Sequence, residues 1–161
     1  MLGYKKMNET FKQYIESLEP LYQRLMQMEP VSVVTLPKET PLSGIYLFSE
    51  DEQHLYVGRT NTIRKRLQNH CRPGSGHNSA TFAFRLARQL TGQTNATYTE
   101  QGSRAYLQND PKFGPIFKAQ KERVRNMNVR YVLEPDPMRQ ALLEMYVSVS
   151  LGTLHNDFDN H

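Results

Sequence analysis

The sequence predicts an α+β domain in which a small mixed or antiparallel sheet of three strands is flanked by helices. Two short β-prone runs lie close together at 45–48 and 54–57, and a third lies far along the chain at 128–133. Segments with apolar residues at spacings of three and four, the helical period, flank these runs. Strands followed by helices, one late strand and a closing helix are typical of a small sheet covered by helices.

The sequence predicts that residues 1–42 form a helical extension, packed on a main domain that spans 43–161. Apolar residues recur at helical spacing from Asn8 to Met28. Pro20 is expected to open a second helical segment there, because proline is tolerated in the first turn of a helix but not in its interior. The run at 31–36 is either a strand or an extended connector.

The first two strands are expected to form a β-hairpin, since only five polar residues, Ser49 to Gln53, join them. Gly44 and Gly58 stand at the strand ends, where glycine allows a close approach of the backbone. A helix follows and runs to about Cys71, with Thr60 or Asn61 as its N-cap.

That helix has an informative pattern of side chains. At 100° per residue, Ile63, Leu67 and Cys71 form an apolar stripe, and Arg66 and His70 lie together along one edge of it. A second helix is expected from a cap at Ser79 to about Leu90, with Phe82, Leu86 and Leu90 on one side. Residues 100–126 look mostly helical with an interruption around 111–115, and a final helix runs from 137 to about 151.

Glu144 is the only Asp, Glu, Lys or Arg between Arg139 and Asp157, and it lies in the final helix. That helix is apolar over most of its surface, so it is expected to be largely buried. An isolated buried carboxylate is costly unless it meets a metal, a cation or several donors. The alternative is that Glu144 lies on a narrow solvent face beside Ser148.

Charge is distributed unevenly along the chain. The segment 53–99 contains no aspartate or glutamate, although it carries seven of the 20 lysines and arginines. The remaining residues hold 13 basic and all 16 acidic side chains, so the excess of positive charge belongs to this segment. Ordinary surfaces mix the two signs of charge. A cationic segment that follows directly on two tyrosine-bearing strands suggests a site for a phosphate polyanion.

Composition excludes several classes of protein. No stretch approaches the roughly 20 apolar residues that a membrane helix needs, and the first residues lack the apolar core of a secretory signal. The single cysteine, Cys71, has no partner for an internal disulfide, which fits a reducing, cytoplasmic compartment. We interpret Cys71 as an ordinary helix residue.

Several of these residues occur together in a specific combination. Gly-Ile-Tyr ends at Tyr46, Tyr-Val-Gly starts at Tyr56, Arg66 follows ten residues after Tyr56, and His70 follows four later. Together with Glu144 in a late helix and Asn156 twelve residues beyond, this pattern resembles the GIY-YIG nuclease superfamily. The similarity runs from Ser43 to Asn156 and implies a GIY-YIG-like domain that hydrolyses DNA phosphodiester bonds.

The resemblance implies a role for each residue of the pattern. Glu144 would bind the one divalent cation, Mg²⁺ or Mn²⁺, and Arg66 would hold the scissile phosphate. Tyr46 is the preferred activator of the attacking water, because nearby cations such as Arg59 or Arg66 favour a phenolate. Tyr56 is the second candidate or holds the water, and His70 is a base or a hydrogen-bond partner.

The remaining assignments concern support and DNA contacts. Asn156 either orients the glutamate, caps the sheet or forms a turn, and Gly44 and Gly58 are supporting residues. Contacts to the DNA backbone are expected from basic residues of the cationic segment and from one histidine, namely Arg59, Arg64, Lys65, Arg72, His77, Arg85 and Arg88.

Three functions are compatible with the sequence. The first is an active endonuclease, and the sequence is compatible with its being a homodimer. The second is a nucleic-acid-binding module of the same fold that has no catalytic activity. The third is a structural or interaction protein in which Glu144 is merely exposed. The sequence names neither the DNA target nor the biological role.

Overall fold

The computed structural model describes residues 5–92 and 103–156. Its three strands form one antiparallel sheet in the order β2-β1-β3, so β2 is an edge strand. The strands and helices are β1 (Gly44–Glu50), β2 (Gln53–Thr60), β3 (Asn128–Leu133), α1 (Glu9–Gln27), α2 (Ile63–Cys71), α3 (Thr81–Thr91), α4 (Arg104–Gln108), α5 (Phe113–Arg125) and α6 (Pro137–Leu151). This architecture confirms the predicted α+β class. Among the described residues, no helix is long and apolar enough to cross a membrane.

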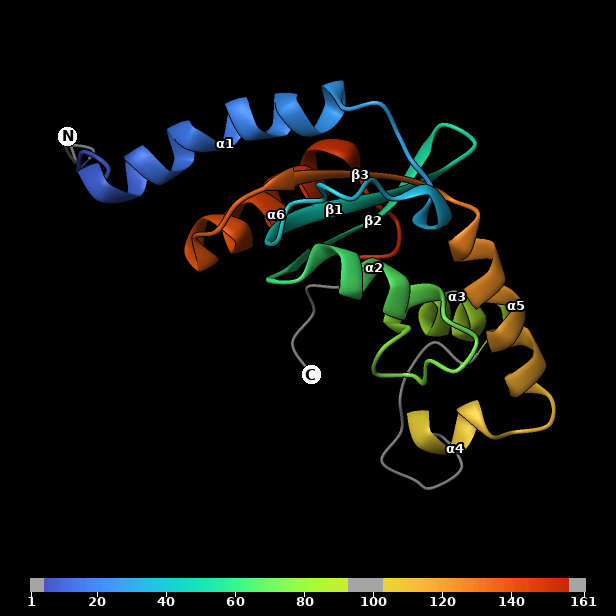
Figure 1. Ribbon diagram of the computed structural model, residues 1–161. Helices are drawn as coiled ribbons and strands as arrows, with labels where there is room; N and C mark the ends of the chain where they lie inside the picture. The colour runs from blue at the N-terminus through green and yellow to red at the C-terminus, as the bar shows by residue number, and fades with distance from the viewer. Residues whose placement is uncertain (1–4, 93–102, 157–161) are drawn as a thin grey trace.

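Helices lie on both faces of the sheet (Figure 1), and each face has a separate apolar core. On one face, Ile45 and Leu47 pack with residues of α1 and α6. On the other face, Tyr46 and Phe48 pack with residues of α2, α3 and α5. The alternation follows from strand geometry, because successive side chains point to opposite faces. The sheet is therefore a layer between two groups of helices.

The N-terminal segment differs from its prediction at Pro20. The structure has one continuous helix, α1, with Pro20 inside it, rather than two segments. Pro20 is exposed, so water can satisfy the carbonyl group that loses its helical donor. Leu18, Leu21 and Leu25 are buried in the same core on both sides of the proline, and this packing keeps the helix in one line.

The connector after α1 is mostly extended. Val31 makes a single bridge to Val129, and a short 3₁₀ helix, η1 (Val33–Thr35), follows it. The hairpin loop is shorter than predicted, because the strands extend to Glu50 and from Gln53. Asp51 and Glu52 both have positive φ, the geometry of a two-residue type I′ turn.

The helix boundaries agree with the sequence better than the caps do. Thr62 and Ala80 occupy the N-cap positions of α2 and α3, in place of the predicted Thr60 or Asn61 and the predicted Ser79. Neither cap makes a side-chain hydrogen bond, so tertiary packing sets these helix starts. Leu90 is 63 % exposed, so it does not share the buried side of Phe82 and Leu86.

The last two regular elements lie where they were predicted, but α6 is not largely buried. Leu143 and Val147 are buried, whereas Met145 and Val149 are 52 % and 80 % exposed. One stripe of α6 packs on the sheet and the opposite stripe faces outward. The region predicted as 100–126 contains α4 and α5 separated by a turn, and its first residues lie outside the described part of the chain.

Candidate active site

Tyr46 and Gly58 lie directly opposite each other in the hairpin. A Cβ atom on Gly58 would lie 2.3 Å from the Tyr46 hydroxyl oxygen, so the phenol of Tyr46 packs directly against the backbone of Gly58. Two residues before Tyr46, at the start of β1, Gly44 has a φ of +154°, and a Cβ there would lie 1.9 Å from the Val132 carbonyl oxygen. One glycine thus admits the close approach of β3, and the other admits the tyrosine ring.

The phenol of Tyr46 is hydrogen-bonded to His70. Its hydroxyl oxygen is 2.7 Å from His70 Nε2, and both side chains are almost completely buried. Burial raises the pKa of Tyr46, and the charges of Tyr56 and Glu144 add to this, against the opposing effect of Arg66. Burial also lowers the pKa of His70 well below its ordinary value, and Arg66 adds to the shift. The two groups therefore form a neutral pair at pH 7.

This environment corrects one expectation about Tyr46. The sequence suggested that nearby cations favour its phenolate, but burial outweighs the effect of Arg66. Tyr56 is the more accessible phenol, being only partly buried, and its ring stacks on Phe82 with centroids 4.7 Å apart. The Tyr46 and Tyr56 rings lie 6.4 Å apart, so the site has an inner and an outer tyrosine.

Arg66 is held in place at the start of α3. Its Nη1 donates to the Ser79 carbonyl oxygen at 3.1 Å, and its Nη2 donates to the Thr81 hydroxyl at 3.0 Å. Arg66 and His70 both act on Tyr46, in agreement with their predicted position on one side of the helix, although His70 is completely buried and Arg66 only partly. They remain close enough for the charge of Arg66 to affect His70.

Glu144 is a partly buried carboxylate rather than a solvent-facing one. Its side chain is 20 % exposed, and its Oε2 lies 3.6 Å from Arg59 Nε. Burial raises the pKa of Glu144, and Arg59 opposes the rise. The alternative of a solvent face beside Ser148 is wrong, because Ser148 is buried and its hydroxyl is 2.7 Å from that of Thr153.

The tyrosines and Glu144 approach each other around the edge of the sheet. Tyr46 and Tyr56 contact the core that contains α2 and α3. Arg59 is the cross-strand partner of Ile45, whose side chain belongs to the opposite core, so Arg59 projects toward α6. Glu144 nevertheless contributes, as the smallest of several effects, to the raised pKa of Tyr46.

Residues 42–105 match the family model of the GIY-YIG catalytic domain. The match supports the GIY-YIG superfamily for this segment of the chain. It suggests a nuclease-type function, because the family consists generally of endonucleases. No curated protein and no solved structure matches the chain. The matched segment contains Tyr46, Tyr56, Arg66 and His70, whereas Glu144 lies beyond its end.

Asn156 supports the edge of the GIY-YIG sheet. Its Nδ2 donates to the Val57 carbonyl oxygen at 2.7 Å, and its Oδ1 accepts from the Val57 amide at 2.8 Å. The Thr153 hydroxyl donates to the same Oδ1. Of the three roles that the sequence left open, these contacts correspond to the cap on the sheet, since they occupy the exposed ladder groups of β2.

Several of the predicted DNA contacts have partners within the protein. Arg64 donates to carbonyl oxygens of Leu36 and Pro37, so it fastens the segment before β1. Arg72 donates to the Gln68 side chain at 3.2 Å. The backbone amide of His77 donates to Gln108 Oε1, and its Nδ1 is 2.9 Å from the same atom, so this residue connects its loop to α4. Lys65 is exposed on α2.

Arg85 and Arg88 lie beside the site rather than in it. They line a pocket of about 200 Å³ together with Tyr56, Thr81 and Arg104. Arg104 was missed in the sequence analysis because it lies beyond the acid-free segment, although it is the first residue of α4. The pocket joins the outer tyrosine to a group of arginines.

The donor set at the GIY-YIG site fits a hard divalent cation that keeps most of its own water. No group of three or more His, Cys, Asp or Glu side chains within residues 5–92 and 103–156 could enclose a metal ion. Glu144 is a single carboxylate, and its ion pair with Arg59 is long. Mg²⁺ is commonly bound through one or two carboxylates, waters and substrate phosphate, so one accessible carboxylate is sufficient.

The structure also brings forward residues that sequence reasoning did not select. Ser79 and Thr81 hold Arg66, and Gln140 lies one helical turn before Glu144. Gln140 is 3 % exposed, so it is a buried polar residue on the same helix as Glu144. That pattern is visible in the sequence, where Gln140 and Glu144 are four apart, and it could have identified Gln140.

Proposed function

We propose that this protein is a metal-dependent endonuclease that hydrolyses DNA phosphodiester bonds. The observation that carries this proposal is the grouping of Tyr46, Tyr56, Arg66 and His70 near Glu144 at the edge of β2. Hydrolysis of a phosphodiester needs an oriented water, donors for the phosphoryl oxygens and stabilisation of the departing 3′-oxygen. The grouped side chains supply chemistry suited to each of these needs.

Arg66 is the residue that we assign to the scissile phosphate. A guanidinium group presents its donors in a planar fork that matches the oxygens of a phosphate. Its hydrogen bonds to these oxygens become stronger as negative charge develops on them. Contacts to Ser79 and Thr81 restrain this side chain before substrate arrives, so little conformational freedom is lost on binding. A restrained donor aimed at developing charge is the most effective kind of electrostatic catalyst.

We assign the attacking water to Tyr56, because Tyr56 is the more accessible of the two phenols. Tyr46 and His70 stand behind it as a neutral hydrogen-bonded pair, in which the imidazole of His70 is the group that can take up a proton. The low pKa of His70 leaves its imidazole unprotonated at neutral pH. We therefore assign His70 to the base side of the reaction.

Glu144 is the residue that would hold Mg²⁺ or Mn²⁺. When bound there, the cation would supply Lewis-acid stabilisation of the phosphoryl group and of the leaving oxygen. Arg59 neutralises Glu144 in the structure described here. We propose that Arg59 turns to a DNA phosphate once Glu144 has a different cationic partner, because its side chain is half exposed.

The DNA strand would run from this site over the pocket next to Tyr56. The pocket is lined by Arg85, Arg88 and Arg104. Lys65, the residue before Arg66, is exposed on α2. Side chains of this kind bind the sugar-phosphate backbone and carry little sequence information. The arrangement supports DNA as the substrate, and it gives no indication of the target sequence.

A nucleic-acid-binding module without catalytic activity is the second candidate. The observation in its favour is the Arg59–Glu144 ion pair, which occupies the carboxylate that would bind metal. In that case the protein would bind DNA with a steep dependence on salt but would not cleave it.

A plasmid-nicking assay separates the two candidates. Supercoiled DNA is incubated with the protein in Mg²⁺, in Mn²⁺ and in EDTA, and conversion to open-circular or linear DNA is measured. We expect cleavage in either metal and none in EDTA. Salt-dependent binding without cleavage in any divalent metal would favour the module and exclude the endonuclease.

A further inference from the structure

The two halves of the proposed site are attached to different layers of the fold. Arg66 and His70 belong to α2, which packs on one face of the sheet, whereas Glu144 belongs to α6, which packs on the other. Within the part of the chain that the structure describes, no common core fixes Glu144 relative to Arg66. Their relative position must therefore depend on the sheet itself and on specific contacts between the two layers.

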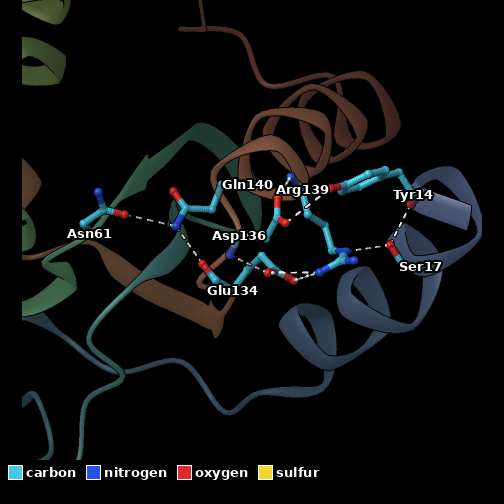
Figure 2. Close-up of polar contacts among 7 residues, drawn as sticks. All are labelled: Tyr14, Ser17, Asn61, Glu134, Asp136, Arg139 and Gln140. Carbon is cyan, nitrogen blue, oxygen red and sulfur yellow. Dashed lines mark hydrogen bonds and ion pairs between the residues drawn. The ribbon is translucent and has the colours of Figure 1, made fainter. Parts of the chain in front are cut away.

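Gln140 makes such a contact. Its side chain is 3 % exposed, and its Nε2 donates to the Glu134 carbonyl oxygen at 2.6 Å and to Asn61 Oδ1 at 3.3 Å. Asn61 lies next to Thr62, the N-cap residue of α2. Figure 2 shows Asn61 and Tyr14 at opposite ends of this group of polar residues. Gln140 and Glu144 are four residues apart, so they lie on the same side of α6.

Arg139 fastens the same end of α6 to α1. Its Nε donates to the Ser17 hydroxyl at 2.9 Å, its Nη1 lies 3.3 Å from the buried carboxylate of Glu134, and its guanidinium covers the Tyr14 ring (Figure 2). Tyr14 also donates to Asp136, the N-cap residue of α6. The start of α6 is therefore held by residues of α1, although α1 lies outside the segment that matches the family model.

We propose that Gln140 and Arg139 are positioning residues for Glu144, and that α1 is part of the support of the catalytic site. This inference rests on the proposed endonuclease function. Gln140 sets the distance between the Glu144 turn and the start of α2, and Arg139 fixes the axial position of α6 against α1. Residues that orient a metal ligand commonly affect metal affinity or activity by about 10- to 100-fold when they are replaced.

The test compares matched replacements in two polar clusters. Gln140→Met and Arg139→Met break the contacts of α6, while Gln120→Met and Arg123→Met break an equivalent Gln–Arg–Glu50 cluster on α5. Cleavage rate, its Mg²⁺ dependence, DNA affinity and melting temperature are measured for all four variants. We expect Gln140→Met and Arg139→Met to lower the rate by about 10- to 100-fold and to require more Mg²⁺, with DNA affinity unchanged.

The α5 variants are expected to lose a comparable amount of melting temperature without a change in Mg²⁺ dependence. Asn61→Ala is expected to reproduce the deficit of Gln140→Met, and the double variant to be no slower than either single variant, because the two residues act through one contact. Equal rate losses in the α5 and α6 variants, or unchanged rates in the α6 variants, would overturn the proposal.

A second measurement does not depend on cleavage. Mn²⁺ broadens amide NMR signals close to its binding site, so it reports where the metal lies. In the unmodified protein we expect broadening both around Glu144 and at Gly58, whereas in Gln140→Met the effect at Gly58 should weaken relative to that around Glu144. Identical patterns in both proteins would overturn the positioning role. Absence of cleavage by the unmodified protein would instead contradict the proposed function.

Discussion

The two faces of the sheet contribute to the site in different ways. On the face covered by α2 and α3, Tyr46 and His70 are completely enclosed and hydrogen-bonded to each other. On the face covered by α6, Glu144 is only partly buried and has one long ion pair with Arg59. The first half is assembled within the apolar core, whereas the second half reaches the site around the edge of β2.

This difference has a consequence for the response to mutation. A change at the enclosed half disturbs folding and catalysis together, because the side chains proposed to take part in the reaction are also packed in the core. A change at Glu144 should remove chemistry while leaving the fold intact, because little of the core depends on its carboxylate. The predictions below separate the two halves on this basis.

The largest effect is expected for Glu144→Ala. We expect it to abolish cleavage and to leave DNA binding largely intact, because the carboxylate that would hold the metal is lost while the basic surface is unchanged. Plasmid cleavage and DNA binding in EDTA are the measurements, with the exposed Glu122→Ala on α5 as the control. Wild-type cleavage by the Glu144 variant would contradict the site assignment.

Arg66→Lys is expected to lower the single-turnover cleavage rate by roughly 10²- to 10³-fold, the usual cost of removing one transition-state donor. Lysine keeps the charge but not the planar fork, so it cannot contact Ser79, Thr81 and a phosphate together. Lys65→Gln is the control, because Lys65 is exposed and should affect binding alone. A rate for Arg66→Lys equal to that of the unmodified protein would show that bidentate contact is unnecessary.

Gly58→Ala tests the enclosed half. The added methyl group would meet the Tyr46 hydroxyl at 2.3 Å, so we expect a loss of roughly 1–3 kcal/mol in the free energy of unfolding together with reduced cleavage. Gly74→Ala is the matched control, because no atom lies within 4 Å of its added methyl group. Urea denaturation measures both variants, and equal stabilities would exclude the close packing described here.

A smaller effect is expected in the pH dependence. Burial raises the pKa of Glu144, and its protonated form does not bind Mg²⁺, so cleavage should fall as pH drops through this raised pKa. Arg59 opposes that rise, so Arg59→Gln should move the acidic limb of the rate profile to higher pH. Rate profiles at DNA concentrations well below saturation provide the measurement, because they report the free protein, in which Arg59 and Glu144 are paired. A limb that moves to lower pH, or not at all, would exclude electrostatic coupling between the two residues.

The enclosed half of the site could be predicted from sequence because its signals are local. Tyr46, Tyr56, Arg66 and His70 lie within 25 residues of each other in the predicted hairpin and the helix after it, and the resemblance to the GIY-YIG family implied their common site. The boundaries of β3 and the start of α6 also followed from β-prone residues and from Pro137. The depth at which His70 is buried did not follow, because it depends on aromatic rings contributed by several elements.

The other half required the structure. The apolar composition of α6 suggested that the helix is largely buried, yet Met145 and Val149 face outward, since composition does not specify which stripe of a helix meets the sheet. The Gln140–Asn61 contact joins residues 79 positions apart, and no local pattern indicates such a pairing. Pro20 was misread because the packing of α1 overrides the local preference of proline.

The most direct test of the account is whether Glu144 and Arg66 act as one catalytic unit. Cleavage of supercoiled plasmid is measured in Mg²⁺ for Glu144→Ala, Arg66→Ala and the double variant. If the two residues act on one phosphate, the double variant should be no slower than the slower single variant. Rate losses that multiply, or Mg²⁺-dependent cleavage that survives in both single variants, would contradict a shared site.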